Sequence, residues 1–360
     1  MTAPTTQAKP DASVTPEAGL AQSAGERAHT HERAEWRGLR IAAFVFFASA
    51  VLFGLIFWMQ GDKFYLRLAT EALIFGGMAL SVDILLGFGG LLSLGQALFF
   101  GLGAYTSALV LKEVAPSFWL AVGASVVMGV VSGLIGGLIA IRVKGVYFAL
   151  ITFGLAQVVS KVIYNTRELG ASDGIIGIPI ITVPLGATEV RTDSPIGFFL
   201  VVLTALLLVY LALGYLSNTP FGRALSGVRI NEHRLAFLGY RPNAIKLGAF
   251  VLAAVVASLC GGLYPMLRGF VSPELMFFDA STNAVVAVVI GGAGTLIGPL
   301  VGAILLTYVR SAVGTFTEHH LIVIGSLFII VVLFFPRGLL GFVRDRYAAA
   351  VRAKSKGPKP

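Results

Sequence analysis

Long apolar runs separated by short polar segments dominate the chain. Each run is about 20 residues long, the length of a helix that crosses a lipid bilayer. The runs are continuously apolar rather than alternating with a period of two, which favours helices over a membrane barrel. The pattern predicts an all-α polytopic membrane protein with about eight to ten transmembrane or half-membrane helices. The predicted segments are 41–60, 66–88, 91–111, 118–141, 146–164, 195–216, 247–267, 283–309 and 321–335.

Two terminal segments fall outside these runs. Residues 1–40 are rich in Ala, Thr, Glu and Pro, and they contain neither the apolar region nor the small-residue cleavage site of a signal peptide. We expect them to form a disordered cytoplasmic tail. The membrane domain is expected to cover residues 41–341, and residues 342–360 are expected to form a basic cytoplasmic tail.

Composition agrees with this class, and the charges predict how the chain crosses the membrane. Hydrophobic residues make up 56% of the chain and charged residues only 12%, and the formal net charge is +9. The basic residues cluster in loops and in the C-terminal tail, where Lys and Arg mark the cytoplasmic side, so no nucleic-acid partner is expected. A cytoplasmic N-terminus places Arg142, Lys144 and the basic loop 217–246 inside, and the acidic-leaning loop 167–193 outside.

One apolar run is interrupted by residues that break helices. Backbone that is not helical at membrane depth is tolerated only where it is buried in protein or lines a cavity. Simple alternation would leave the basic tail 344–359 outside, so we expect the run 283–309 to form two half-segments that return the C-terminus to the cytoplasm. The interrupting residues are Gly291, Gly292, Gly294, Gly298 and Pro299.

Glycines at every fourth position predict close helix packing. Such residues share one helix face and let two backbones approach each other closely. We interpret the first set as packing alone, whereas the second set lies in the interrupted run and is expected to serve packing, the transport pathway or both. The two sets are Gly129, Gly133 and Gly137, and Gly294, Gly298 and Gly302.

Few ionisable residues lie inside the apolar runs, and each is costly there without a partner. Arg67 and Glu71 are four residues apart, so we expect them to pair on one helix face. Asp83 has no local partner, and it precedes a glycine-rich turn that suggests a place near the cytoplasmic surface. A structural role and a transport role for Asp83 both stay open. Cys260, the only cysteine of the chain, is expected to be a buried, inert thiol.

No pattern of catalytic, metal-binding or cofactor-binding residues is apparent. None of the histidines has carboxylate or cysteine neighbours at the spacing of a metal site. The stretch GGAGTLIG from Gly291 lacks the preceding strand of a phosphate-binding turn, and no G-x-x-x-x-G-K-[ST] motif is present. Any ATP hydrolysis must therefore take place in another polypeptide. The histidines are His29, His31, His233, His319 and His320.

The most informative polar segment is the loop 217–246. It carries five basic residues against a single acid, Glu232, and residues 231–238 have helical character with Gly239 as a C-terminal cap. The loop thus predicts a short amphipathic helix that lies parallel to the membrane and offers a docking surface. The alternative is a loop that only obeys the positive-inside rule. The basic residues are Arg223, Arg229, Arg234, Arg241 and Lys246.

This loop resembles the coupling loop of ABC importer permeases, in which a Glu and small residues precede a glycine. Here those positions are Glu232, Ala236 and Gly239, with one more residue between the Glu and the glycine than is usual. The wider pattern is similar to that of the branched-chain amino acid permeases. It consists of Gly222, Arg223, Ala224, Arg229, Asn231, Glu232, Leu238 and Gly239.

Further blocks, in the same order along the chain, resemble the M-type subunit of that family. Together they extend the resemblance from about residue 83 to residue 341. The blocks are GGLLSLGQALFFGLGAYTSAL from Gly89, YFALITFG from Tyr147, SDGIIGIP from Ser172, GFVSPELMFF from Gly269, VVIGGAGTLIGPLVGA from Val288 and FFPRGLLG from Phe334.

The resemblance implies the fold and the partners of an ABC importer permease in the bacterial inner membrane. The partners would be a second homologous permease, two cytoplasmic ATP-binding subunits and a periplasmic solute-binding protein. The coupling residues would be Gly222, Arg223, Arg229, Asn231, Glu232, Ala236 and Gly239. The residues facing the binding protein would be Ser172, Asp173, Ser272, Glu274 and Asp279.

Other functions stay in view at this point. A urea or short-chain amide permease of the same superfamily is the main rival to a permease for branched-chain or related hydrophobic amino acids. An ion-coupled secondary transporter would need acidic or hydroxyl clusters within broken helices, for which only Asp83 and the run after Asn283 qualify. A membrane enzyme would need paired carboxylates or a metal cluster, and the sequence contains no such pattern.

Overall fold

The computed structural model describes residues 41–185 and 188–316, together with 325, 326, 329, 333 and 338–341. The chain divides into a unit Ala43–Val343 and a second unit of Met1–Ala42 with Arg344–Pro360. Both predicted tails, His319, His320 and most of the predicted segment 321–335 lie outside the described residues. All helices discussed below belong to the unit Ala43–Val343, apart from the first two residues of the first helix.

The described part of the chain contains eight helices that are long and apolar enough to cross a membrane, as predicted. The first is Ile41–Gln60. The others are α2 (Lys63–Asp83) with a π-helical turn Ile84–Phe88, α3 (Gln96–Leu109) with a π-helical turn Val110–Val114, α4 (Phe118–Ala140), α5 (Val146–Asn165), α6 (Pro195–Ser217), α8 (Pro242–Arg268) and α10 (Ile297–Phe316).

Shorter elements connect these helices. The helices α7 (Pro220–Phe237) and α9 (Phe278–Gly291) precede α8 and α10, respectively. Two-residue strands β1 (Ile175–Ile176) and β4 (Phe270–Val271) pair antiparallel, with Ile175 opposite Val271. Strands β2 (Thr182–Leu185) and β3 (Thr188–Arg191) form a second antiparallel pair. Single 3₁₀ turns cover Arg167–Leu169 and Pro273–Met276.

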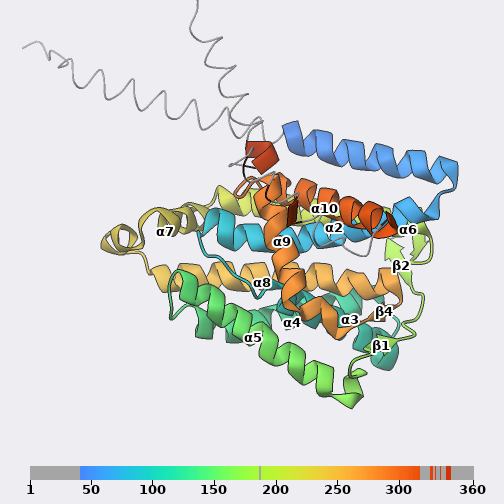
Figure 1. The fold of residues 1–360 in the computed structure, drawn as a ribbon, viewed down its shortest axis with the longest axis horizontal. Coiled ribbons are helices and arrows are strands. Elements are labelled where there is room, and N and C mark those ends of the chain that lie inside the picture. The colour runs from blue at the N-terminus through green and yellow to red at the C-terminus, as the bar shows by residue number, and fades with distance from the viewer. Residues whose placement is uncertain are drawn as a thin grey trace, which may run out of the picture. The chain divides into compact units, whose positions relative to one another are not determined.

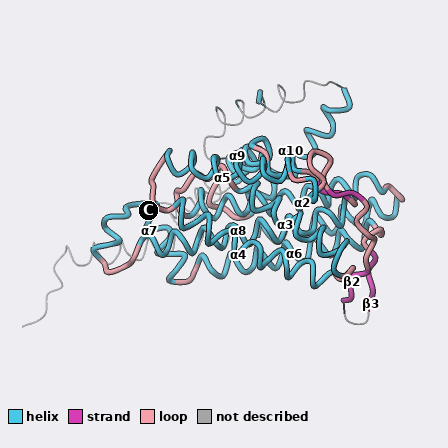
Figure 2. The backbone as a smooth tube through the Cα atoms, turned by 90° about the horizontal axis from the view of Figure 1, so that it is seen from below, coloured by secondary structure: helices cyan, strands magenta, loops and turns pink. Residues whose placement is uncertain are grey.

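The centre of the unit Ala43–Val343 is α8, which packs against α2, α3 and α4 (Figures 1 and 2). Glycine brings these helices into backbone contact. A Cβ atom on Gly103 of α3 would overlap the carbonyl oxygen of Ser258 in α8, and one on Gly261 of α8 would overlap that of Phe100 in α3. Small residues at a crossing permit this approach, and the van der Waals contact it allows drives association inside a membrane.

The glycines Gly129, Gly133 and Gly137 lie on the side of α4 that faces α8. A Cβ atom on Gly129 would be 2.8 Å from the Cα of Val255, and one on Gly133 would be 2.7 Å from the Cβ of Ala254. The four-residue spacing therefore places these three glycines at a helix crossing.

The interrupted run forms two helices, and the predicted break lies at residues 292–296. Gly292, Gly294 and Leu296 all have positive φ angles of 112°, 79° and 60°, which a helix cannot contain. Only α9, with 14 residues, is of half-membrane length, because α10 has 20. The prediction of two half-segments is thus right about the break and wrong about the second piece. Gly294 lies in the break, so it does not share a helix face with Gly298 and Gly302.

The predicted pair of Arg67 and Glu71 is wrong, because a tertiary partner takes the carboxylate. Arg268, at the end of α8, donates from Nη2 to Glu71 Oε2 at 2.6 Å. This ion pair links α2 to α8. Cys260 is buried as predicted, with its Sγ in the space that a Cβ on Gly77 would occupy.

The unit has two distinct ends. Figure 1 places α7 at one end of the long helices and the strands β1, β2 and β4 at the other, and Figure 2 shows the same separation. The turn between α4 and α5 lies at the α7 end, since Lys144 contacts Glu232 there. The two sets of predicted contact residues therefore lie at opposite ends of the helices.

Candidate functional site

The helix α7 begins in a tight turn directly after α6. Thr219 caps it by accepting the N–H of Gly222, and Pro220 occupies the first position, where a missing N–H costs nothing. A Cβ on Gly222 would lie 2.5 Å from the carbonyl oxygens of Leu216 and Ser217. Gly222 therefore permits the sharp reversal that brings α7 back against the end of α6.

The helix is divided by a kink at Asn231. Asn231 has φ −161° and ψ 103°, which is extended backbone, and its Oδ1 accepts the N–H of Arg234 at 3.0 Å. This is the geometry of a helix N-cap, so a second, short helical piece begins after Asn231. That piece ends where Gly239, with φ 84°, donates its N–H to the oxygen of Ala236. The predicted helix 231–238 is thus present, but Asn231 caps it rather than belonging to it.

Glu232 points back toward the long helices and forms an ion cluster. Its Oε2 lies 2.8 Å from Nζ of Lys246 at the start of α8 and 3.2 Å from Nζ of Lys144 in the α4–α5 turn. Lys246 is only 3% exposed. Partial burial raises the pKa of Glu232, but the hydrogen bonds from Lys246 and Lys144 lower it more, so the pKa lies below its ordinary value. The cluster fixes the second piece of α7 to two other segments.

The replacement Glu232→Gln should destabilise the protein by roughly 2 kcal/mol at neutral pH, because it leaves the buried Lys246 without a counter-ion. A glutamate whose pKa is lower in the folded protein than in the unfolded chain, where it is about 4.3, stabilises the fold at pH values above 4.3. This stabilisation is lost as the pH falls through the pKa of the folded protein. The thermal midpoints of wild type and Glu232→Gln should therefore converge as the pH is lowered in detergent. A gap that is independent of pH would contradict the cluster.

The matched control is Lys144→Gln. Lys144 contacts the same carboxylate, but its side chain is 61% exposed, so its removal should cost less than about 1 kcal/mol.

On both sides of this cluster in the sequence, α7 and the turn after it carry exposed apolar side chains. Phe237 is 92% exposed and Ile230 is 81% exposed, and Leu238 and Tyr240 are also largely exposed. We name these four residues the α7 tip. They lie at the ends of the membrane-spanning helices, beside charged residues, and exposed apolar surface of this kind marks a contact with another protein or with the membrane surface. The sequence interpretation missed the tip, because apolar residues attract no attention in such a hydrophobic chain; their position within a basic loop is the signal that could have identified them.

The predicted coupling residues have different positions in α7. Arg223, Asn231, Ala236 and Gly239 are exposed, whereas Gly222 is buried. Glu232 turns inward to its two lysines, and Arg229 donates a hydrogen bond from Nη1 to the carbonyl oxygen of Gly87. The loop thus contains an outward surface and two inward anchors.

At the other end, the β1–β4 pair brings two predicted segments together. Gly174 packs so closely on Val271 that a Cβ atom on Gly174 would overlap the carbonyl oxygen of Val271. Their neighbours in the chain, Asp173 and Ser272, therefore lie close to each other. Ser172 donates to Asp173 at 3.0 Å. Glu274 lies exposed in the following 3₁₀ turn, and Asp279 lies exposed in the first turn of α9. The structure therefore gathers the five predicted contact residues at one end.

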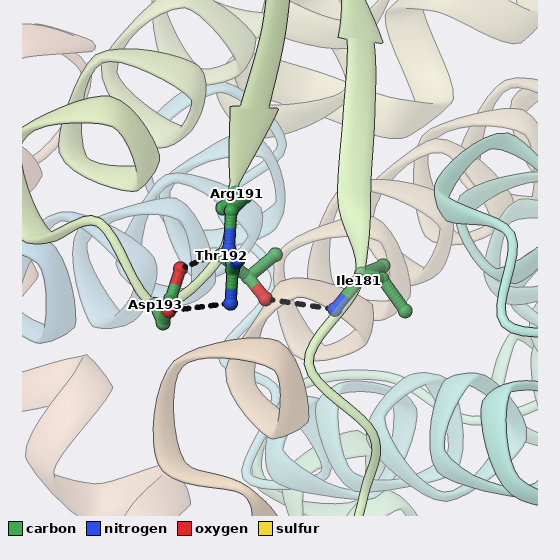
Figure 3. A network of polar contacts seen from close by, with 4 residues as sticks. All are labelled: Ile181, Arg191, Thr192 and Asp193. Atoms are coloured by element: carbon green, nitrogen blue, oxygen red, sulfur yellow. Dashed lines mark hydrogen bonds and ion pairs between the residues drawn. The ribbon is translucent and has the colours of Figure 1, made fainter.

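The β2–β3 hairpin lies at this end too and was not predicted. Figure 3 shows the base of the hairpin, where Ile181 donates its N–H to Thr192 Oγ1 at 3.1 Å. Beside it, Arg191 donates from Nε and Nη2 to both carboxylate oxygens of Asp193, at 3.1 and 3.0 Å. Trp119 of α4 donates to the oxygen of Pro184 at 3.3 Å. The Trp119 contact, together with the packing of β3 on α6, gives the hairpin a defined place over α4 and α6.

No cluster of three or more His, Cys, Asp or Glu side chains that could hold a metal ion occurs among the described residues. The two candidate sites described above are surfaces at the opposite ends of the helices.

Comparison with known proteins gives the family. The family described as "Branched-chain amino acid transport system / permease component" matches residues 64–332. The high-affinity branched-chain amino acid transport system permease protein LivM of Escherichia coli (strain K12) is 33% identical over 300 residues, which cover 78% of this chain and 70% of LivM. LivM of Salmonella typhimurium (strain LT2) is 31% identical over 299 residues, with the same coverage of both chains.

A third relative belongs to a different import system. The autoinducer 2 import system permease protein LsrC of Yersinia pseudotuberculosis (serotype O:1b, strain IP 31758) is 29% identical over 271 residues, which cover 69% of this chain and 71% of LsrC. No solved structure matches the chain. The family match and the two LivM proteins confirm the resemblance inferred from the motifs: this chain belongs to the family of branched-chain amino acid transport system permease components.

Proposed function

We propose that this permease carries branched-chain or related hydrophobic amino acids across the bacterial inner membrane as one subunit of an ATP-driven importer. Its partners are a second homologous permease, two cytoplasmic ATP-binding subunits and a periplasmic solute-binding protein. The names of the two LivM relatives support the substrate class. The partner set rests on the resemblance to ABC importer permeases.

The observation that carries the proposal is the α7 tip on its two anchors. An exposed Phe237 and Ile230 in a basic, water-facing segment offer an apolar surface to a protein partner. The ion cluster of Glu232 holds that surface to α8 and the α4–α5 turn, so a displacement of the tip moves membrane-spanning helices with it. These are the properties that an element docked on an ATPase requires.

The opposite end is the proposed contact for the solute-binding protein. Ser172, Asp173 and Ser272 lie beside the β1–β4 pair, with Glu274 and Asp279 following in the chain. This assignment places α7 and both termini in the cytoplasm. Trypsin added to inside-out vesicles should therefore cleave after the exposed Arg234 of the intact permease, and trypsin added to right-side-out vesicles should not. Cleavage there only from the right-side-out face would reverse the orientation.

An alternative substrate has one specific observation in its favour. The LsrC relative belongs to an autoinducer 2 import system, so relatives that match most of this chain do not all carry amino acids. A urea or short-chain amide permease is the other candidate within the superfamily.

An ion-coupled transporter is disfavoured, because both carboxylate oxygens of the buried Asp83 already accept backbone N–H groups.

Purification of the chain from its native membrane tests the function directly. Mass spectrometry should find a second permease and two P-loop ATPases in the complex. In proteoliposomes with ATP on the α7 side and binding protein on the other, labelled leucine should be taken up, and unlabelled isoleucine and valine should compete. Uptake without ATP, or a complex without ATPases, would favour the ion-coupled alternative. ATP-driven uptake in which only urea or amides compete would change the substrate class.

A further inference from the structure

Two segments that are more than 200 residues apart in the sequence meet at the buried carboxylate of Asp83. The side chain lies at the end of α2 and is 0% exposed. Its Oδ1 accepts the N–H of Gly294 at 2.6 Å, and its Oδ2 accepts the N–H of Leu296 at 3.2 Å. Both N–H groups belong to the break between α9 and α10. Asp83 therefore fixes the position of this break relative to α2.

The backbone at the break is held in an unusual conformation. Leu296 has a positive φ of 60°, which is uncommon for a residue with a side chain and is maintained only when the surroundings determine it. The hydrogen bond to Asp83 supplies that constraint. Gly338 adds another, because a Cβ on it would lie 2.8 Å from the oxygen of Val289, near the end of α9. The break is thus a packed joint rather than a loose loop.

The turn that follows Asp83 connects the same joint to α7. Asp83 is followed by the π-helical turn Ile84–Phe88, and a Cβ on Gly87 in this turn would overlap both Asp83 Oδ1 and the nitrogen of Gly294. The carbonyl oxygen of Gly87 accepts the hydrogen bond from Nη1 of Arg229. Arg229 also packs on Gly90, because a Cβ atom placed on Gly90 would lie 2.8 Å from Cγ of Arg229.

We propose that Arg229 and Asp83 are positioning residues that connect α7 to the break between α9 and α10. We name the chain of contacts Arg229, Gly87, Asp83, Gly294 and Leu296 the Arg229–Asp83 link. The inference rests on the proposed role of α7 as the ATPase-docking element. It assigns to the link the task of moving α9 and α10 when α7 is displaced.

The kink in α7 explains how the Arg229–Asp83 link can transmit a movement of α7 to α9 and α10. Arg229 lies before Asn231, in the first piece of α7, and bonds to Gly87 in the turn that packs against the joint. Glu232 lies after Asn231, in the second piece, and contacts α8 and the α4–α5 turn. A change of angle at Asn231 therefore moves the two groups of helices relative to each other, which is what opening a pathway requires.

Two variants break the link at different points. Arg229→Gln removes the bond to Gly87 without touching the break, and Asp83→Asn leaves one acceptor oxygen for two N–H groups. The matched control is Asp62→Asn at the other end of α2. Asp62 also accepts two backbone N–H groups, from Phe64 and Tyr65, but it does so far from α7.

Hydrogen exchange in the purified chain tests the link without any partner. In Arg229→Gln the amides of residues 292–298 should exchange about fivefold faster than in wild type. Asp62→Asn should leave their exchange unchanged. Unchanged exchange at residues 292–298 in Arg229→Gln would overturn the link, because the arginine would then not constrain the break.

Transport by the assembled complex is the second readout. Arg229→Gln and Asp83→Asn should each lower the amount of substrate taken up per ATP hydrolysed by about five- to tenfold. The double variant should show the same ratio as the single variants, because all three interrupt one connection. Equal loss of ATPase activity, assembly and uptake would indicate a purely structural role and overturn the inference. A wild-type complex without ATPases would refute the proposed function, while the exchange result would still decide the link.

Discussion

Gly261→Leu in α8 is expected to abolish recovery of folded permease. The backbones of α3 and α8 touch at this crossing, and even a Cβ on Gly261 would overlap the carbonyl oxygen of Phe100. The helices would have to separate, which would also disturb the reciprocal contact of Gly103 with Ser258. Overpacking a tight interior typically costs about 1–3 kcal/mol or more, and here no flexible side chain can yield. Size-exclusion chromatography of a fluorescent fusion in mild detergent measures the outcome.

Gly123→Leu on α4 is the matched control. No atom lies within 4 Å of a Cβ placed on Gly123, so the same substitution meets open space and also improves helix propensity. It should give a monodisperse peak equal to that of wild type. A wild-type yield of Gly261→Leu would mean that α3 and α8 do not approach as closely as described.

Phe237→Asp should abolish ATP-driven uptake while leaving the permease folded. The side chain is almost fully exposed, so its replacement removes no packing within the chain. If Phe237 is an anchor in the contact with the ATPase, its loss should cost about 2–4 kcal/mol of binding, which corresponds to roughly 30- to 1000-fold weaker association. The measurement is the amount of ATPase that co-purifies, together with leucine uptake in proteoliposomes.

Asn243→Asp provides the control for added charge. Asn243 is exposed at the start of α8, at the same end of the molecule, and lies outside the α7 tip. This variant should retain both the ATPase and uptake. Full ATPase recovery with Phe237→Asp would place the docking surface elsewhere and remove the main support for the proposed function.

The membrane-spanning helices could be predicted from the sequence, because the length of an apolar run is a local property of the chain. The break in the run 283–309 was visible in its glycines for the same reason. The partners of the polar residues were not predictable. Glu71 has Arg67 at the spacing of a helical pair, yet it binds Arg268 from another helix. Asp83 binds backbone groups of Gly294 and Leu296, more than 200 residues away, which leave no mark in the side-chain pattern.

The candidate site divides in the same way. Gly239 and the helix before it followed from capping rules, since a cap depends on neighbouring residues. The inward direction of Glu232 did not, because one of its partners, Lys144, lies in a different loop. Phe237 escaped notice because its exposure depends on where the long helices end. Functional residues that act through tertiary contacts or through exposure therefore required the structure.

The burial of Cys260 has a practical consequence. It is the only cysteine in the sequence, and its sulfur is enclosed between α8 and α2. A thiol reagent that labels exposed cysteines should therefore leave the native chain unmodified. A cysteine introduced on α7 or beside the β1–β4 pair would be the sole reactive site, so a spectroscopic probe can be attached there without first replacing Cys260 and followed through a transport cycle.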